Sequence, residues 1–356
     1  MSTGSSSAIP SQVQGLVEAR PWTSRNATSA KKAPHSLAII GDGAVACEMA
    51  HAWWALGTTE VILISRHKRI LDKYEPLVGD RLEEIFKQRG ISIYNSVNVK
   101  EVKRINSTSK EENGGGSVQI VLDDGNSITA EEILVAVGRK PNTDKLGLET
   151  IGLKPGDWLD VDDTCLVNGV DGDKWLYAIG DINHRALLTH IGKYQARTCA
   201  TAIVALARGT RNTSNNNTHD GSDEDGGNSG NIDSTSNTTY DPRNMWVATS
   251  DRTAIPQVVF TDPQIASVGL TEESARGLKI NVRAVDCEMG TLEGAKLRTD
   301  GYEGHARIVV DEDRHVIVGA TFVGPEVGEL LHSATIAIVG QVPLERLWHA
   351  VPHFLL

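Results

Sequence analysis

The chain has 356 residues, of which 40% are hydrophobic, and a formal net charge of −11. This length allows two domains, or three small ones, each with its own apolar core. The acidic balance argues against a nucleic acid or an anionic membrane as partner, since neither attracts such a protein. The sequence has no apolar run of membrane-spanning length and no secretory signal core, so we expect a cytoplasmic protein, with a mitochondrial location still open.

The first 35 residues are polar. Pro10, Pro21 and Pro34 interrupt any long helix in this region. We therefore expect residues 1–35 to be a linker or leader that is largely disordered.

The stretch from Ser36 to Gly57 has the pattern of a strand, a tight turn and a helix. An apolar run ends at Gly41, and Gly43 and Ala46 follow with the spacing G-x-G-x-x-A. In this pattern the first glycine permits the turn, the second lets backbone approach a pyrophosphate, and the small third residue lets helix and strand pack closely. The N-terminus of the helix then offers N–H groups to phosphate. The stretch predicts a dinucleotide site; a tight turn without a ligand is the alternative.

The residues after the second strand bear on the choice of coenzyme. Val61–Ile64 completes the spacing of a βαβ unit. NAD-binding units often carry an acid at this point, but residues 65–69 contain none and are basic. Arg66 could accept a 2′-phosphate, which favours NADP over NAD, whereas a solvated basic loop leaves the choice open. The carboxylate of Asp42, inside the glycine turn, would repel a pyrophosphate unless it points away.

The region up to residue 140 continues as alternating helix and strand. Leu77–Gln88 predicts an amphipathic helix that stops at Gly90. Strands are expected at Ile91–Tyr94, Val97–Val102, Val118–Leu122, Ser127–Thr129 and Ile133–Val137. We therefore expect residues 36–140 to form a parallel nucleotide-binding core with an antiparallel appendage.

The next region contains a second candidate for ligand binding. Strand patterns at Leu159–Val167 and Trp175–Ile179 precede a helix expected from Leu187 to Ala207. Asp181 follows the second of these strands beside a glycine. It could bind a sugar hydroxyl, and a solvated or helix-capping aspartate is at least as good an interpretation.

A low-complexity segment separates this region from the C-terminal part. Residues 209–250 are expected to be a disordered insert, because their Asn, Ser, Thr, Gly and Asp residues cannot form a core. Residues 251–356 have the pattern of an α+β domain. Strands are expected at Val258–Phe260, Arg307–Val310, Val316–Val318 and Ala320–Val323, and helices at Thr271–Arg276 and Glu326–Val339.

Five stretches together resemble one family, in the order in which the family has them. The family is that of the flavin-dependent pyridine nucleotide–disulfide oxidoreductases, which includes glutathione reductase, dihydrolipoamide dehydrogenase and mercuric reductase. The stretches are IIGDGAVACEMA (39–50), ILVAVGRKPN (133–142), LYAIGD (176–181) with LLTHIGKYQA (187–196), PQVVFTDPQIASVGLTEE (256–273) and GATFVGPEVGELLHSATIAI (319–338).

The resemblance implies an α/β fold with three parts. These are a Rossmann-like NAD(P)-binding domain at residues 36–140, the C-terminal remnant of a second, FAD-binding α/β domain at 141–208, and an α+β dimerisation domain at 251–356 that forms a homodimer. It also implies ligand roles. Gly41, Gly43 and Ala46 hold the pyrophosphate of NADP or NAD, Glu48 lies near the nicotinamide, Arg66 holds a 2′-phosphate, Gly138 closes the domain towards the flavin, and Asp181 bonds the ribityl chain of FAD.

The chain departs from the family pattern at both ends. It has no second G-x-G-x-x-G, its four cysteines have neither C-x-x-x-x-C nor zinc spacing, and it stops at Val351–Leu356, where the family's His-Pro motif should develop. The family activity is hydride transfer between NAD(P)H and flavin. We expect this chain to be truncated and catalytically incomplete, with no catalytic residue and without tightly bound FAD. The alternative is a non-catalytic NAD(P)-binding and dimerisation fragment, or an incomplete gene model.

Overall fold

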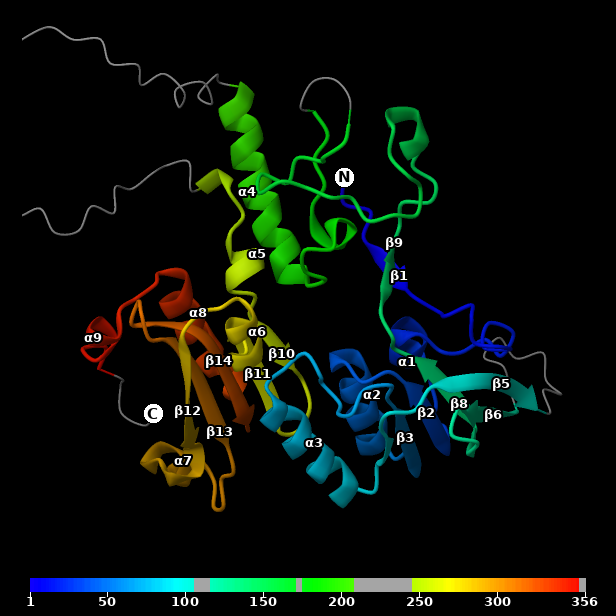
Figure 1. Ribbon diagram of the computed structural model, residues 1–356. Helices are drawn as coiled ribbons and strands as arrows, with labels where there is room; N and C mark the ends of the chain where they lie inside the picture. Colours follow the sequence, from blue (N-terminus) through cyan, green and yellow to red (C-terminus); the bar gives the residue numbers. More distant parts are fainter. Residues whose placement is uncertain (106–115, 171–174, 208–244, 352–356) are drawn as a thin grey trace, which may run out of the picture. The chain divides into compact units, whose positions relative to one another are not determined.

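The computed structural model describes residues 1–105, 116–170, 175–207 and 245–351 (Figure 1). The chain divides into two compact units, and each is described by itself. The first is Met1–Gly4 with Pro141–Arg252, and the second is Ser5–Lys140 with Thr253–Leu356. The nucleotide-binding and α+β regions expected from the sequence therefore belong to the same unit.

A four-stranded parallel sheet forms the centre of the second unit. Its strands are β2 (Ser36–Ile40), β3 (Glu60–Ile64), β4 (Ser92–Tyr94) and β8 (Glu132–Val135), in the order β4-β3-β2-β8. Helix α2 (Ala44–Ala55) connects β2 to β3, and α3 (Pro76–Gln88) connects β3 to β4. Leu37, Ile39 and Leu63 are buried in one core with residues of both helices. The predicted βαβ unit is confirmed.

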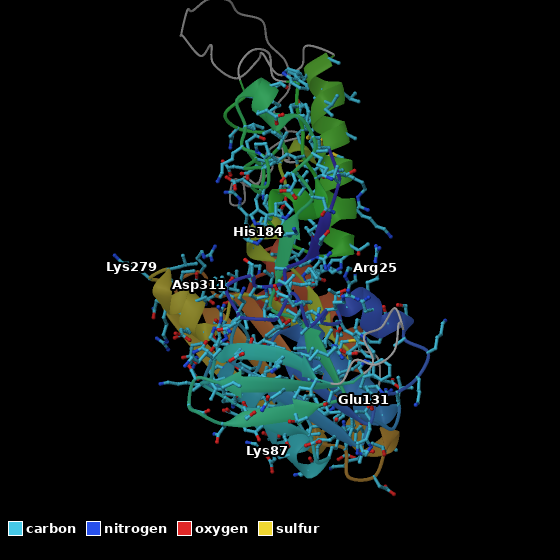
Figure 2. The ribbon with its side chains drawn as sticks, turned by 90° about the vertical axis from the view of Figure 1, so that its right-hand side faces the viewer. Arg25, Lys87, Glu131, His184, Lys279 and Asp311 are labelled. Atoms are coloured by element: carbon cyan, nitrogen blue, oxygen red, sulfur yellow. The ribbon has the colours of Figure 1, made fainter. Side chains whose placement is uncertain are left out.

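The predicted antiparallel appendage is also confirmed. Strands β5 (Val99–Ile105), β6 (Ser117–Leu122) and β7 (Ser127–Ala130) form a three-stranded sheet. Alternate residues of β6 are buried in a core with Ala38, Ile62 and Ile133 of the parallel sheet. The sheet thus covers the face of β2, β3 and β8 that α2 and α3 leave open. Glu131, labelled in Figure 2, lies between β7 and β8 and accepts a hydrogen bond from the His35 N–H at 2.5 Å.

The expectation that residues 1–35 are a disordered leader is wrong. Leu16 is fully buried among the β5–β7 side chains, and Trp22 forms a parallel bridge with Leu134 of β8. Helix α1 (Ser24–Ser29) follows directly. The physical reason is that β8 is an edge strand, whose unpaired N–H and C=O groups take up the passing segment.

The C-terminal part of the second unit is an antiparallel five-stranded sheet with segregated helices, as expected for an α+β domain. The strand order is β10-β11-β14-β13-β12. The strands are β10 (Gln257–Val259), β11 (Gln264–Gly269), β12 (Val282–Glu288), β13 (His305–Asp311) and β14 (Val316–Gly324). The helices are α6 (Glu272–Gly277), α7 (Glu293–Arg298), α8 (Leu331–Val339) and α9 (Leu344–Leu347). Strands β11 and β12 and helices α7 and α9 were not expected from the sequence.

The two strands expected at Val316–Val318 and Ala320–Val323 are one continuous strand, β14. Gly319 lies within this strand and does not interrupt it. The Leu270 carbonyl passes so close to Gly319 that a Cβ at this position would overlap it. A glycine is therefore needed for the close approach rather than for a turn.

Several contacts join the nucleotide-binding and α+β regions within the second unit. Val259, Ile265 and Val323 of the antiparallel sheet are buried in the same core as α2 and α3. Arg89, just after α3, donates to the Asp262 carboxylate at 2.6 Å and to its carbonyl at 2.7 Å. The α2–α3 layer therefore has a sheet on each side.

The first unit has less regular structure than the sequence predicts. Its long helix is α4 (Thr189–Ala207), close to the expected bounds. The strands expected at Leu159–Val167 and Trp175–Ile179 are wrong, since the described part has only isolated bridges there, such as Leu166 with Tyr177. Buried residues of these runs pack with two 3-10 turns, η1 (Leu148–Ile151) and η2 (Gly180–Asn183), in a small core. Burial among loops therefore accounts for their apolar pattern.

The insert expected at 209–250 lies almost wholly outside the described residues. Its last residues, 245–250, are described and lead into α5 (Ser250–Thr253). Ala248 is fully buried, and its N–H donates to the Asp163 carbonyl at 2.6 Å. The described residues 245–250 are therefore part of the first unit rather than of a disordered insert.

Candidate nucleotide-binding site

The glycine turn joins β2 to α2 at the carboxyl end of the parallel sheet. Gly41 has φ +129°, and a Cβ at this position would lie 2.4 Å from the Ala136 carbonyl oxygen. The Gly41 N–H donates to the Ile64 carbonyl at 3.0 Å. The positive φ and the close Ala136 carbonyl require glycine here, because the turn lies against the chain that continues from β8.

Gly43 and Ala46 form the start of α2. Gly43 is the N-cap of the helix, and a Cβ built on it would meet no atom within 4 Å. Ala46 is fully buried beneath the turn. The first N–H groups of an α-helix have no acceptor within the helix, so this open N-terminus can bind phosphate oxygens. The residues present therefore fit the pyrophosphate of a dinucleotide.

The Asp42 carboxylate is held at the end of β3. Its Oδ2 accepts a hydrogen bond from Ser65 Oγ at 2.5 Å and lies 2.7 Å from His67 Nδ1. The Asp42 carbonyl accepts from the Leu71 N–H at 2.8 Å. Sequence reasoning missed these contacts, because Asp42 and His67 are separated by a helix and a strand. The hydrogen bonds from Ser65 and His67 reduce the repulsion that the Asp42 carboxylate would exert on a pyrophosphate.

Glu48 lies one turn into α2. Its Oε1 accepts a hydrogen bond from the Phe260 N–H at 2.9 Å. Burial raises the pKa of the Glu48 carboxyl, and the Phe260 hydrogen bond opposes this rise. Phe260 itself is 67% exposed beside this carboxyl. The sequence indicated Glu48 but not its partner from the α+β region.

Gly138 lies beyond the end of β8. It has φ +142°, and a Cβ built on it would meet no atom within 4 Å. Its carbonyl accepts from the Ala8 N–H at 3.0 Å, next to the two-stranded sheet of β1 (Ser5–Ser7) and β9 (Arg139–Pro141). The extension of β8 that carries Gly138 also passes Gly41. Both glycines therefore lie at the carboxyl end of the parallel sheet.

In the basic loop after β3, the exposed cations Arg66 and Lys68 have no assigned partner in the described part of the chain. Arg69 donates to both carboxylate oxygens of Asp80, at 3.1 and 3.2 Å. The Arg66 side chain is exposed and makes no hydrogen bond or ion pair with the part of the chain that the structure describes. It can therefore take an anionic ligand, but no contact brings it to the glycine turn.

Asp181 belongs to the first unit and lies half-buried in η2. The turn that carries it is tied to α4 by the buried Gln195, whose Oε1 accepts from the Gly180 N–H at 2.8 Å and from Asn183 Nδ2 at 3.0 Å. Gln195 Nε2 in turn donates to Asp251 at 2.8 Å. The position of Asp181 is thus well fixed within its own unit.

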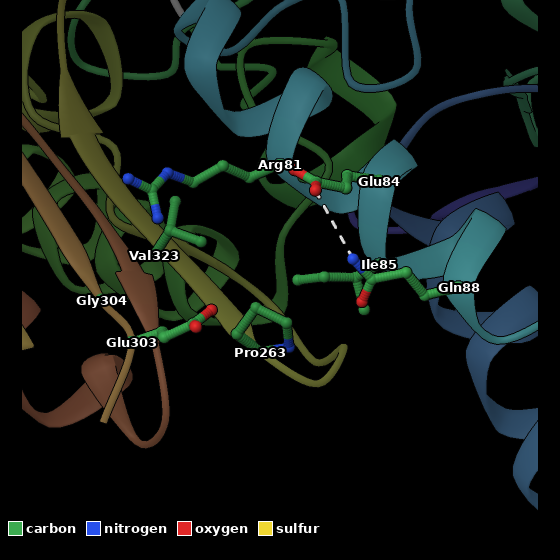
Figure 3. A pocket seen from close by; sticks show the side chains of 8 residues that line it. All are labelled: Arg81, Glu84, Ile85, Gln88, Pro263, Glu303, Gly304 and Val323. Carbon is green, nitrogen blue, oxygen red and sulfur yellow. Dashed lines mark hydrogen bonds between the residues drawn. The ribbon is translucent and has the colours of Figure 1, made fainter. Parts of the chain in front are cut away.

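A pocket of about 230 Å³ lies between α3 and the antiparallel sheet (Figure 3). None of the site residues expected from the sequence lines it. Its lining residues are Arg81, Glu84, Ile85, Gln88, Pro263, Glu303, Gly304 and Val323. Arg81 is already paired with the Glu288 carboxylate at 2.8 Å. The pocket is therefore separate from the glycine turn.

The parallel sheet and its glycine turn define a dinucleotide-binding fold joined to an α+β domain. Residues 1–209 match the pyridine nucleotide-disulphide oxidoreductase family, and residues 255–354 match the dimerisation domain of the same family. The chain belongs to this family. No helix in the described part of the chain combines the length and apolarity needed to cross a membrane.

The similar proteins agree with this assignment. A mercuric reductase of Shewanella putrefaciens is 30% identical over 98% of this chain and 52% of its own length, and a dihydrolipoyl dehydrogenase of Geobacillus stearothermophilus is 27% identical over 88% and 56%. The chain thus spans about half the length of these relatives. The HOCl-induced flavoprotein disulfide reductase RclA from Escherichia coli has the same fold, with a TM-score of 0.73 at 18% identity over 99% of this chain and 69% of its own.

Proposed function

We propose that this chain binds NADP(H) in the turn formed by Gly41, Gly43 and Ala46. The observation that carries the proposal is the open N-terminus of α2: Gly43 leaves it uncovered, while the Asp42 carboxylate is held by Ser65 and His67. An uncovered helix N-terminus after a glycine turn favours a pyrophosphate.

The other residues of the site have distinct roles in this proposal. Arg66, an exposed cation after β3, pairs with the 2′-phosphate and selects NADP over NAD. Glu48 lies at the nicotinamide, where its carboxyl is kept in place by the Phe260 N–H. Gly138 leaves room beside the turn for the coenzyme. When bound, the nicotinamide supplies the hydride that the family's oxidoreductase chemistry uses.

For the flavin, the candidate contact in the described residues is Asp181. Asp181 is held in η2 and is proposed to bond the ribityl chain of FAD. The described part of the first unit has no further glycine turn in front of an α-helix.

The α+β region at 251–356 is proposed to form a homodimer. Apolar side chains are exposed on its C-terminal helices, with Ile336 57%, Val339 52% and Trp348 86% exposed. An exposed apolar surface of this kind favours a second copy of the chain. Light scattering of the purified protein tests the state, and a monomer at micromolar concentration would contradict it.

The coenzyme proposal is tested by fluorescence titration with NADPH and NADH. We expect NADPH to bind at least tenfold more tightly, since an Arg–phosphate pair contributes a charge-assisted hydrogen bond. Arg66→Glu should abolish the difference. Lys279→Glu, at an exposed lysine outside the site (Figure 2), makes the same change in net charge and should leave it intact. Equal affinities for the two coenzymes in the unaltered protein would contradict the NADP assignment.

A further inference from the structure

The contact between Asp42 and His67 lies where a dinucleotide site discriminates between its coenzymes. In a βαβ unit of this type, the residue after the second strand faces the adenosine ribose and often carries the acid that bonds its hydroxyls. Here Ser65 directly follows β3, and the loop 65–69 has no acid. The Asp42 carboxylate, 2.5 Å from Ser65 Oγ, brings a negative charge to this point from the glycine turn instead.

This carboxylate is held by short contacts to partly or fully buried side chains. Asp42 has a side-chain exposure of only 17%, and Ser65 is fully buried. The Ser65 hydroxyl that donates to Asp42 also accepts from the His67 N–H at 3.0 Å. The His67 ring is 37% exposed, with Nδ1 directed at Asp42 Oδ2 at 2.7 Å. The three side chains thus form one unit at the end of β3.

We propose that Asp42 and His67 together determine whether the site accepts a 2′-phosphate. His67 masks the Asp42 carboxylate by donating Nδ1–H to it, so that Arg66 can receive the phosphate without repulsion. Once unmasked, the carboxylate accepts hydrogen bonds from the ribose hydroxyls and repels a 2′-phosphate. This inference rests on the proposed binding of NADP(H), and both residues are positioning and specificity residues.

Other cations near the loop do not replace His67 in this role. Arg69 is engaged by both oxygens of the Asp80 carboxylate. The side chains of Arg66 and Lys68 are exposed, and neither bonds Asp42 within the part of the chain that the structure describes. His67 is thus the basic group that contacts the Asp42 carboxylate there.

The test uses two probes that differ only in the 2′-phosphate, adenosine 2′,5′-bisphosphate and 5′-AMP. Their dissociation constants are measured by calorimetry for the full chain and three variants, His67→Ala, Asp42→Asn and the double variant. We expect His67→Ala to lower the preference for the bisphosphate about tenfold, which is the scale of one lost hydrogen bond to a charged carboxylate. Asp42→Asn should not lower the preference, and the double variant should restore it, because no charge is left to mask.

His315→Ala is the matched control. Like His67, it places Nδ1 near a carboxylate, 3.1 Å from Glu345 Oε1, but it lies in the α+β region. It should leave the preference unchanged. Circular dichroism confirms that each variant is folded, and the double variant provides the comparison if His67→Ala alone is unstable.

The outcomes separate this inference from the proposed function. A bisphosphate preference that His67→Ala leaves intact, or that the double variant fails to restore, overturns the masking role and leaves NADP(H) binding standing. Absence of binding of either probe, with NADPH and NADH also failing to bind, overturns the proposed function and this inference together.

Discussion

The Glu48 carboxylate accepts a 2.9 Å hydrogen bond from the backbone N–H of Phe260, and so ties the helix of the glycine turn to the α+β region. Burial raises the pKa of this carboxyl. An acid with a raised pKa in the folded state contributes most to stability below its unfolded pKa, and this contribution is lost as the pH rises through the folded pKa. At neutral pH the ionised Glu48 therefore lowers the stability.

Replacing Glu48 by Gln should remove this penalty. Gln keeps an acceptor for the Phe260 N–H but carries no charge, so we expect the free energy of unfolding at pH 8 to rise by up to about 1 kcal/mol. The gain should vanish near pH 4. Urea unfolding at both pH values measures it, and Glu48→Ala, which loses the acceptor, serves as control. A Gln variant less stable than the original at pH 8 would contradict the burial penalty.

The two glycines of the turn should respond differently to alanine. Gly41→Ala forces a Cβ to within 2.4 Å of the Ala136 carbonyl oxygen at φ +129°, so we expect a loss of stability of about 2 kcal/mol or more. Gly43→Ala meets open space and should leave the stability within about 1 kcal/mol, while NADPH affinity falls about tenfold because the methyl group covers the helix N-terminus. Thermal unfolding and titration check both. Equal loss of stability in the two variants would refute this separation.

Glu75 should be essential to the junction between α3 and the antiparallel sheet. Its carboxylate is 1% exposed, accepts from the Glu272 N–H at 2.7 Å and pairs with Arg307 at 3.2 Å. Glu75→Ala leaves these donors without their acceptor, and we expect a loss of about 3 kcal/mol in urea unfolding. Glu84→Ala, at an exposed position of α3, should cost less than about 0.5 kcal/mol. A loss for Glu75→Ala as small as this control would show that the junction does not depend on it.

Asp286 should make part of the stability depend on pH in the acid range. Hydrogen bonds from Arg307, and then from His305, lower its pKa to about 2. A lowered pKa contributes stability above the unfolded value of about 3.9, and this contribution is lost as the pH falls through the folded value. Asp286→Asn should thus cost about 1 kcal/mol at pH 7, after allowance for solvent screening, and less than half of that at pH 2. A difference at pH 2 as large as that at pH 7 would contradict the assignment; Asp300→Asn, at an exposed residue, is the control.

One thiol per chain should react rapidly in the native protein. Cys287 is exposed, whereas the other three cysteines are buried. Burial raises the pKa of Cys165 to about 12 and also raises the pKa values of Cys47 and Cys199, so these thiols are both covered and protonated at pH 8. A colorimetric thiol reagent should label one equivalent at once and all four after denaturation. Cys287→Ser should abolish the fast phase, and a second fast thiol would contradict this.

The βαβ unit could be predicted because its signals are local. Apolar runs, Gly41, Gly43 and the stop at Gly57 lie within a short stretch, and each acts on its immediate neighbours. Local signals could not predict that residues 1–35 have a defined structure. Trp22 and Leu16 are buried by strands about 80 residues or more further along the chain, so their own composition indicated only a polar segment.

The sequence by itself determined the dinucleotide-binding fold and the position of its glycine turn, because backbone freedom and helix initiation depend on residues close together in the chain. Only the tertiary structure decided which groups meet around that turn. It brought Asp42 to His67 and Glu48 to Phe260. These contacts arise from the packing of α2, β3 and β10, and the fit of layers that are distant in sequence leaves no local pattern.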